Sequence, residues 1–483
     1  MLVDMPKDRK PISCKWVFKK KYSPSGQIVK YKARLVARGF TQQHKIDYNE
    51  TFAPTLRFES LRILISLAIQ YGLILWLLDV VIAYLNGKFD VDIFMALPEG
   101  LLKTNINKNK VLKILKSLYG LKQSGRIWNE TFKKTVGKAG FYPITSDPCI
   151  FKKEIDDGDV CLIALYVDDI IVASAKKSTY RKVKEIITSS FEVTDSGELF
   201  GVLGIRINRD PKGRFITMDQ TTYVEGMLEK HGITNCNPIS TPFDGYNDIR
   251  PADDDEELID ERQYQQLVGE LIFLNQATRP DLSFAISKLF QFCNKPIRRH
   301  YNTLTRVLKY LHKTKNLGLV YRTAGSRVRH YTDAAFADNK KDRRSTHGYV
   351  GVNVGAACVW YSRKQRSVVT STVEAEYIAL AEGCKTAIWV NQWINEAGYL
   401  TEPIILNGDN NGSLSLAKNP EQHARTKHID IQYHFVREKV LENIVSVAHV
   451  SSKDQLADII TKPLTKPLFE RMRLMLGLQL INN

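Results

Sequence analysis

The sequence predicts a multidomain protein of mixed α/β and α+β class, and three observations lead to this prediction. The chain has 483 residues, a length that corresponds to about three or four domains of ordinary size. Apolar patterns of helical spacing and short β-branched runs both occur along it. Beyond Gly318 short β-branched segments take over, which marks a further region.

Composition and charge exclude several classes of protein and indicate a polyanionic partner. With 43% hydrophobic, 10% aromatic and 25% charged residues, the chain is neither disordered nor fibrous. Its 69 Lys and Arg residues exceed its 52 Asp and Glu residues, which gives a formal net charge of +17. Because phosphate backbones are common polyanions, nucleic acid is the first expected partner and a membrane surface the second.

Cysteine usage favours an intracellular, cytoplasmic protein. Seven cysteines are scattered along the chain without a close pair, which argues for reduced thiols and against a disulfide framework or a zinc ribbon. The first ten residues are rich in charge and no apolar core region follows them, so we expect no signal peptide.

The first 43 residues are strongly basic, with eleven Lys or Arg residues against two acidic ones and interleaved aromatic residues. Such an alternation suits strands that hold a phosphate backbone or a triphosphate. The equally weighted alternative is an ordinary solvated hairpin with its turn at Pro24, Ser25 and Gly26.

The most hydrophobic stretch, residues 63–85, is long enough to cross a bilayer. Asp79 lies within it, however, and a carboxylate in hydrocarbon costs at least about 2.5 kcal/mol. Gly72 also marks a helix end. We therefore predict an amphipathic helix over residues 60–71 and a buried strand over residues 73–81, with Asp79 at the end of this strand and no membrane contact.

The remaining elements follow from the spacing of apolar residues. Helices are expected over residues 263–290 and 301–314, with a break between apolar runs at Arg279, Pro280 and Asp281. An acidic run at 253–257 predicts an exposed linker. Further on we expect strands at 329–332, 348–354, 359–362 and 404–406, a long helix over 372–396 and a short helix near 454–462.

Two adjacent acids, Asp168 and Asp169, lie between two apolar β-like runs and predict a hairpin with carboxylates at its tip. Neighbouring carboxylates raise each other's pKa unless a divalent cation neutralises them, so a metal is expected. With Asp79, three carboxylates from two strands suit two Mg²⁺ ions about 3.5–4 Å apart, and Mn²⁺ is an alternative.

A pair of adjacent acids is weak evidence for a catalytic site by itself, but the sequence segments around this pair are a specific signal. Four segments follow one another in the chain: KARLVARGF at 32–40, YNETFAP at 48–54, SLYGLKQS at 117–124 and YVDD at 166–169. Together and in this order they closely resemble the reverse transcriptase of copia-type LTR retrotransposons. The resemblance runs from about Lys10 to the C-terminus.

This resemblance implies a right-hand polymerase of fingers, palm and thumb, followed by a ribonuclease H-like α/β domain. The implied boundaries are 1–235 for N-terminally truncated fingers and palm, 236–320 for a linker with thumb and connection helices, and 321–483 for the ribonuclease H-like domain. Asp79, Asp168 and Asp169 are then the metal ligands of RNA-directed DNA synthesis. The implied partners are an RNA template, a DNA primer, dNTPs and an RNA–DNA hybrid, with an oligomer or other polyprotein products as further partners.

The resemblance also assigns nucleotide-pocket residues. Arg34, with Lys32 as a second candidate, would hold the triphosphate, and Gln123 would line the pocket. Tyr84 stands where such enzymes place a ring that excludes a ribose 2′-hydroxyl, and a core aromatic is the alternative. His300 and Arg306 match the thumb and connection region, where they either contact the duplex backbone or belong to an ordinary surface helix.

A second set of acids resembles the ribonuclease H site of the same family, in which four acids bind two metals and hydrolyse the RNA of a hybrid. These acids are Asp333, Glu376, Asp409 and Asp458. Glu374 is a rival of Glu376, because two residues along a helix change the face. His449 is either a mobile histidine that aids turnover or a surface residue at a strand end.

A histidine-rich segment at 423–434 does not have the spacing of a zinc site. In terms of the family resemblance, Arg425, Lys427 and His428 are expected to contact the backbone of the hybrid.

Three departures from the family pattern bear on activity. Val81 and Ile82 occupy a place that usually holds a polar or basic residue, Gly125 replaces a usual proline, and Ala335 replaces a usual second Asp. All presumed metal ligands are retained. Because related polymerases begin several tens of residues earlier, we expect a C-terminal fragment of a polyprotein or the product of a decayed element. An intact parent element would place the chain in a virus-like particle.

Two hypotheses follow. The first is a bifunctional enzyme, an RNA-directed DNA polymerase with ribonuclease H activity. The second is a catalytically silent, nucleic-acid-binding remnant of a decayed element.

Overall fold

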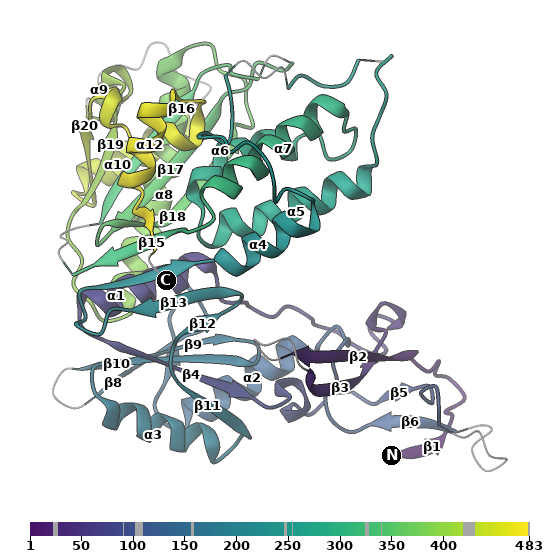
Figure 1. The fold of residues 1–483 in the computed structure, drawn as a ribbon. Coiled ribbons are helices and arrows are strands. Elements are labelled where there is room, and N and C mark those ends of the chain that lie inside the picture. Colours follow the sequence, from purple (N-terminus) through teal and green to yellow (C-terminus); the bar gives the residue numbers. More distant parts are fainter. Residues whose placement is uncertain are drawn as a thin grey trace. The chain divides into compact units, whose positions relative to one another are not determined.

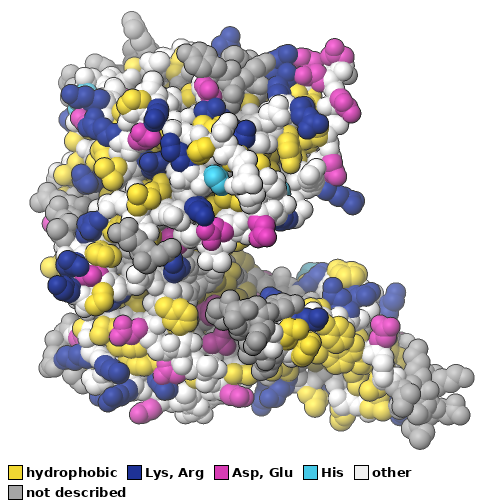
Figure 2. Space-filling model, in the orientation of Figure 1, with side chains coloured by type: hydrophobic (Ala, Val, Ile, Leu, Met, Phe, Trp, Pro, Cys, Tyr) yellow, Lys and Arg dark blue, Asp and Glu magenta, His cyan; other side chains and the backbone are white. Residues whose placement is uncertain are grey.

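The computed structural model describes residues 1–22, 28–89, 91–101, 110–155, 159–245, 249–253, 255–323, 328–339, 341–418 and 430–481. The chain forms two compact units, which we call the first unit (Met1–Leu56 and Leu75–Glu198) and the second unit (Arg57–Ile74 and Leu199–Asn483) (Figure 1). The division into three domains stays a prediction. In Figure 2, Lys and Arg side chains are spread over the visible face of both units.

A six-stranded sheet with the order β11-β4-β10-β9-β8-β7 forms the body of the first unit. Its strands are β4 (Ile74–Val80), β7 (Tyr142–Pro143), β8 (Ile150–Glu154), β9 (Val160–Tyr166), β10 (Asp169–Ser174) and β11 (Val193–Glu198). β9 and β10 form an antiparallel hairpin in which Asp169 pairs with Tyr166. The predicted hairpin with two acids at its tip is confirmed.

The apolar runs of β9 and β10 explain why this hairpin is central. Residues 160–165 and 170–174 are all buried. Helices α2 (Ser124–Gly137) and α3 (Lys177–Thr188) add aromatic packing, and Trp128 of α2 meets Phe191 edge-on at 5.0 Å between ring centroids. The acids at the tip therefore sit on a rigid, buried support.

Two smaller sheets complete the first unit. β2 (Cys14–Tyr22) pairs with β3 (Ile28–Ala37), and β1 (Leu2–Asp4), β6 (Lys110–Ile114) and β5 (Ile93–Met95) form a three-stranded sheet. The β2–β3 register places Trp16 and Phe18 on one face and Lys32 and Arg34 on the other. Hydrophobic side chains gather over this part of the molecule in Figure 2. The predicted turn at Pro24, Ser25 and Gly26 lies outside the described residues.

Helix α1 (Phe58–Gln70) opens the second unit and confirms the predicted helix. Its predicted amphipathic character is wrong, because every residue from 60 to 69 is buried. Even Arg62 is 1% exposed, and its guanidinium donates to the Cys358 carbonyl at 2.7 Å and stacks over the Trp360 ring. No helix among the described residues has the length and apolarity to cross a membrane.

A five-stranded sheet with the order β12-β13-β14-β15-β21 follows in the second unit. It contains β12 (Gly201–Val202), β13 (Ile205–Arg209), β14 (Phe215–Asp219), β15 (Leu317–Arg322) and β21 (Leu478–Leu480). The described residues between β14 and β15 contain the α-helices α4 (Thr221–Lys230), α5 (Glu261–Ala277), α6 (Ser283–Phe290) and α7 (Arg298–Lys313).

The predicted break between α5 and α6 is confirmed at Arg279, Pro280 and Asp281. Arg279 and Asp281 form a buried ion pair of 2.8 Å at this break. The expected duplex contact of His300 is wrong. This residue is 0% exposed and its ring stacks on Phe292 with centroids 3.9 Å apart, because α7 turns it inward.

The C-terminal part of the second unit is a mixed sheet with the order β18-β17-β16-β19-β20. Its strands are β16 (Arg329–Ala335), β17 (Thr346–Asn353), β18 (Ala356–Lys364), β19 (Ile404–Gly408) and β20 (Val445–His449). β16, β17 and β18 are antiparallel, whereas β19 runs parallel to both β16 and β20. The predicted strands in this region are confirmed.

Helices complete this α/β layer: α8 (Thr372–Glu396), α9 (Asn411–Lys418), α10 (Asp430–Leu441), α11 (Asp458–Thr461) and α12 (Lys466–Met475). α8 has the predicted bounds and packs against β16, β17 and β19. The predicted fold class of mixed α/β and α+β units, with an α/β domain at the C-terminal end, is confirmed by these sheets and helices.

Candidate active sites

The first candidate site lies where β4 meets the tip of the β9–β10 hairpin. Asp79 is the last residue but one of β4, and β4 lies beside β10 in the sheet. The Val80 amide donates to the Asp168 carbonyl at 2.8 Å. The structure therefore brings the three predicted acids, Asp79, Asp168 and Asp169, together from two neighbouring strands.

The turn that presents these acids is strained. Val167 has a left-handed backbone, with φ of 51°, a conformation that costs a β-branched residue about 1–3 kcal/mol. The Trp128 indole on α2 donates to the Val167 carbonyl at 2.8 Å and thereby holds the turn. With this conformation Val167 forms the turn between Tyr166 and Asp169, and Asp168 and Asp169 lie at the hairpin tip.

Electrostatics show that the three carboxylates interact. Burial raises the pKa of Asp169 to about 6, and the charges of Asp79 and Asp168 add to this effect. Burial also raises the pKa of Asp168, although a hydrogen bond from Tyr119 counteracts it. Carboxylates that disfavour each other's ionisation in this way fit a divalent cation, which would remove the repulsion.

Tyr119 is a site residue that the sequence analysis missed. Its hydroxyl donates to both carboxylate oxygens of Asp168 at 3.1 Å. Its ring packs on Tyr84, with centroids 4.6 Å apart, and the Arg34 guanidinium lies 5.1 Å over its face. Tyr119 belongs to the SLYGLKQS segment, so its motif was visible, but only the fold shows what its hydroxyl contacts.

The predicted nucleotide-pocket residues fall into two groups. Arg34 and Lys32 share one face of β3, and their charges lower the pKa of Asp168, so both lie near the acids. Gln123 is instead 1% exposed. Its amide donates to the Asp47 carbonyl at 2.8 Å and accepts from Gln42 at 3.0 Å. The roles of these residues, and of the half-buried Tyr84, stay predictions.

The second candidate site is a tighter cluster in the second unit. Asp333 lies on β16, Asp409 directly follows the neighbouring strand β19, and Asp458 begins α11. One carboxylate oxygen from each of the three lies within 4.8 Å of the other two, which is close enough for them to hold a divalent metal together. The structure thus brings together three of the four predicted acids, from positions far apart in the sequence.

Glu376 on α8 is the fourth member. Burial raises its pKa well above the usual range, and the charges of Asp333 and Asp409 raise it further. Glu374 has a different task, because its carboxylate accepts from the Thr370 amide at 2.9 Å and its own amide donates to the Ser371 hydroxyl. The Ser371 hydroxyl thus caps the start of α8, and the Glu374 carboxylate holds Thr370, the residue before the cap.

Two residues of the second cluster were missed by the sequence analysis. The Lys462 ammonium lies 2.9 Å from Asp458 Oδ1 and 3.7 Å from Asp333 Oδ1. The Thr461 hydroxyl donates to Asp333. Both lie in the segment that was recognised for Asp458, but a sequence does not show that they point at Asp333.

The remaining predictions for this region have different outcomes. His449 is exposed at the end of β20 and pairs with Gly408, the residue before Asp409, so its role in turnover stays a prediction. Arg425, Lys427 and His428 lie outside the described residues.

Comparison with known proteins identifies the family. Residues 1–244 match the family described as reverse transcriptase (RNA-dependent DNA polymerase). The chain belongs to this reverse transcriptase family. It is also 31% identical over 307 residues to the putative transposon Ty5-1 protein YCL074W of Saccharomyces cerevisiae, and it covers 98% of that protein.

Larger relatives of this reverse transcriptase family are transposon polyproteins. The chain is 34% identical over 482 residues to the retrovirus-related Pol polyprotein from transposon TNT 1-94 of Nicotiana tabacum. It is 35% identical over 468 residues to that from transposon RE1 of Arabidopsis thaliana. These matches cover 99% and 96% of this chain but only 36% and 32% of the relatives. The resemblance to copia-type retrotransposons is confirmed, and the chain spans about a third of these relatives.

Solved structures give weaker likenesses. A ribonuclease H1, LC11-RNase H1 in complex with RNA/DNA hybrid, aligns with a TM-score of 0.23 and 12% identity over 28% of this chain and 94% of that one. A foamy viral protease-reverse transcriptase in complex with dsDNA aligns with a TM-score of 0.21 and 11% identity over 93% of this chain and 77% of that one. At these TM-scores neither structure adds to the argument from the sheets themselves.

Proposed function

We propose that this chain is an RNA-directed DNA polymerase with ribonuclease H activity, from the Pol polyprotein of a copia-type retrotransposon. The observation that carries the proposal is the presence of two separate carboxylate clusters in a chain of the reverse transcriptase family. One cluster contains Asp79, Asp168 and Asp169, and the other contains Asp333, Glu376, Asp409 and Asp458. The proposed substrates are dNTPs with a primed RNA template, and the RNA strand of an RNA–DNA hybrid.

In the first site, Asp79, Asp168 and Asp169 would hold two Mg²⁺ ions, with Mn²⁺ as an alternative. When bound, such ions lower the pKa of an attacking hydroxyl and neutralise the charge of a leaving pyrophosphate. Tyr119 holds the Asp168 carboxylate in place through its hydroxyl. Arg34 and Lys32, on one face of β3, would bind the triphosphate, and the Tyr84 ring beside Tyr119 would exclude a 2′-hydroxyl.

In the second site, the four acids would hold two Mg²⁺ ions that supply Lewis-acid chemistry for the attack of water on an RNA phosphate. Thr461 fixes the orientation of Asp333 by donating a hydrogen bond to it. Lys462 supplies a positive charge beside Asp458 and Asp333. His449, exposed next to Asp409, would assist turnover.

The proposal is tested by primer extension on an RNA template with Mg²⁺, with cleavage of a labelled hybrid followed in the same reaction. We expect both activities in the unsubstituted chain. Asp168→Asn should remove extension and leave cleavage, whereas Asp333→Asn should remove cleavage and leave extension. Binding of nucleic acid with neither activity would contradict the proposal and favour the silent remnant.

We further propose an intracellular, cytoplasmic location. The seven free thiols support it, because such thiols persist in a reducing compartment. Other products of a polyprotein, or a second copy of the chain, are proposed as additional partners.

A further inference from the structure

The second unit contains a cavity of about 860 Å³ that none of the carboxylates of the two clusters lines. Its walls come from the segment 249–252, from helix α6 with the residues that follow it, and from the connection between β16 and β17. Pro463, the residue after Lys462, also lines it. The two proposed activities leave this cavity without a role.

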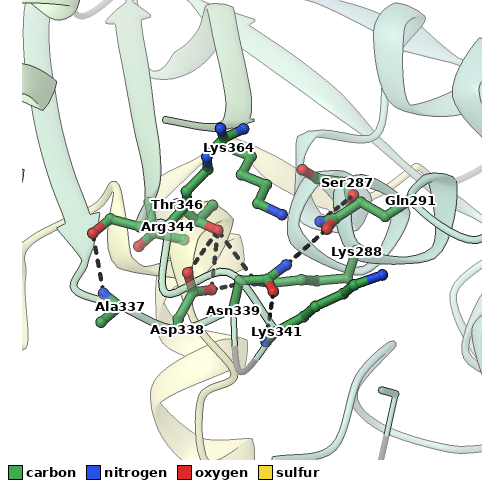
Figure 3. A network of polar contacts seen from close by, with 12 residues as sticks. Ser287, Lys288, Gln291, Ala337, Asp338, Asn339, Lys341, Arg344, Thr346 and Lys364 are labelled. Carbon is green, nitrogen blue, oxygen red and sulfur yellow. Dashed lines mark hydrogen bonds and ion pairs between the residues drawn. The ribbon is translucent and has the colours of Figure 1, made fainter. Parts of the chain in front are cut away.

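Polar contacts hold two of these walls together (Figure 3). The buried Lys288 of α6 pairs with Asp338 and donates to the Thr346 hydroxyl at 3.1 Å. The Asn339 amide donates to Gln291 of the segment that follows α6 at 3.0 Å. The cavity is therefore formed by walls that are fixed to each other.

The lining of the cavity is cationic. Among the described residues that line it, five side chains are Lys or Arg and two are Asp, so the net formal charge of these residues is +3. Both carboxylates are already paired, Asp338 with Lys288 and Asp342 with Lys364, the latter at 2.6 Å. Lys295 and Lys341 are exposed and have no ion-pair partner within the described part of the chain. A ligand of this cavity is therefore expected to be an anion.

Aromatic side chains favour one kind of anion. Phe243 and Phe284 line the cavity and meet edge-on, with ring centroids 5.0 Å apart, and Phe292 also lines it. A nucleic acid strand combines phosphates for the lysines with sugars and bases for the rings, whereas an acidic peptide uses the charges alone.

The place of the cavity in the fold relates it to the second carboxylate cluster. Asp338 lies five residues beyond Asp333, so their Cα atoms are at most about 18 Å apart. At a rise of about 3.4 Å per nucleotide, this distance corresponds to about five nucleotides. Pro463 provides a second connection, because it follows Lys462, which contacts Asp458 and Asp333.

We propose that this cavity binds the phosphodiester backbone of the RNA–DNA hybrid, within about five nucleotides of the phosphate cleaved at the second cluster. The proposal rests on the proposed ribonuclease H function and adds to it a binding site that includes Lys295 and Lys341.

The test compares Lys295→Gln/Lys341→Gln with Lys182→Gln/Lys212→Gln in the full chain. The control removes the same charge from exposed positions that do not line the cavity. Fluorescence anisotropy measures the affinity for a labelled RNA–DNA hybrid over a series of salt concentrations. We expect about tenfold weaker binding at low salt for the cavity variant, and a decrease of about 1–2 in the slope of log K against log salt. The control should keep the affinity and slope of the unsubstituted chain.

A second readout locates the contact. Uncharged methylphosphonate linkages are placed at successive positions of the hybrid. The unsubstituted chain should lose affinity at a position within about five nucleotides of its cleavage site, and the cavity variant should be insensitive there. Circular dichroism melting confirms that both variants are folded.

The outcomes separate this proposal from the proposed function. Hybrid cleavage by the unsubstituted chain, with equal affinities of the cavity variant and the control, overturns the cavity proposal alone. Equal hybrid affinities with weaker binding of polyglutamate to the cavity variant would assign the cavity to an acidic peptide and also overturn it. If the unsubstituted chain binds no hybrid, both proposals are wrong.

Discussion

The two carboxylate clusters of this chain contain the same kinds of side chain but differ in how their charge is balanced. In the first unit Asp79 is exposed, and Asp168 and Asp169 are half-buried at a hairpin tip. In the second unit Asp333 and Asp458 are almost completely buried. The first cluster receives a hydroxyl donor from Tyr119, whereas the second has a cation, Lys462, in direct contact.

The difference in charge balance between the two clusters follows from how deeply their carboxylates are buried. Burial and neighbouring charge raise the pKa of Asp169 to about 6 and that of Asp458 to about 8. A more deeply buried cluster has a higher cost of ionisation, which an internal countercharge reduces before any metal binds. The half-buried turn of the first cluster therefore depends on a bound metal to balance its charge, whereas the buried second cluster contains its own cation.

The largest expected effect concerns the second cluster and distinguishes the roles of two glutamates of α8, Glu376 and Glu374. Glu376→Gln should lower hybrid cleavage at least about 100-fold, because a metal contributes several kcal/mol to the transition state. Glu374→Gln should retain cleavage within about twofold, since Glu374 contacts Thr370 and glutamine keeps an acceptor oxygen for that amide. Initial rates of cleavage measure both, with primer extension as the internal control. Equal losses would contradict the assignment of Glu376.

The next effect tests the internal cation. Lys462→Met should raise the affinity of the second cluster for Mg²⁺ about tenfold or more, because a positive charge next to the site is removed. It should also lower the melting temperature in EDTA, where the acids lose their counterion. Titration calorimetry with Mg²⁺ and thermal unfolding measure the two effects, and Lys453→Met, at an exposed position, is the matched control. An unchanged Mg²⁺ affinity would show that Lys462 does not compensate the cluster.

A smaller effect is expected in the first cluster. Tyr119→Phe removes the donor to Asp168, and the loss of a hydrogen bond that contributes about 1 kcal/mol should slow extension about fivefold. The pKa of Asp168, which this hydrogen bond lowers, should rise, so the acid limb of the pH–rate profile should move to higher pH. Tyr142→Phe, at an exposed residue, should leave rate and profile unchanged. A slower enzyme with the same profile would assign Tyr119 to packing alone.

The smallest effect is the pH dependence of stability without metal. A carboxyl with a raised pKa holds its proton more tightly in the folded state, so the free energy of unfolding falls as pH rises from about 4 to the folded pKa. The window ends near pH 6 for Asp169 and near pH 8 for Asp458. The melting temperature in EDTA should fall by about 2–4 °C between pH 6 and 8. Asp458→Asn should suppress this fall, whereas Asp169→Asn should not. A drop that persists in Asp458→Asn would break the comparison.

Much of the fold was accessible from the sequence because its patterns are local. The apolar runs on either side of Asp168 and Asp169 predicted the hairpin, and the periodicity over residues 372–396 predicted α8. The 60–71 pattern predicted a helix but not its complete burial, because Arg62 is compensated by carbonyls from distant segments.

The two candidate sites show the same division between what local sequence patterns predict and what contacts between distant segments decide. The sequence by itself determined the family to which the chain belongs and pointed to the seven acids as candidate site residues, because each acid lies in a short contiguous motif. Only the tertiary structure decided that Tyr119 contacts Asp168, 49 residues away, and that Thr461 contacts Asp333, 128 residues away. It also showed that the Glu374 carboxylate accepts from Thr370, and it brought the cavity walls together. The physical reason is that a side chain's direction and distant neighbours depend on packing between elements, which no local pattern of residues specifies.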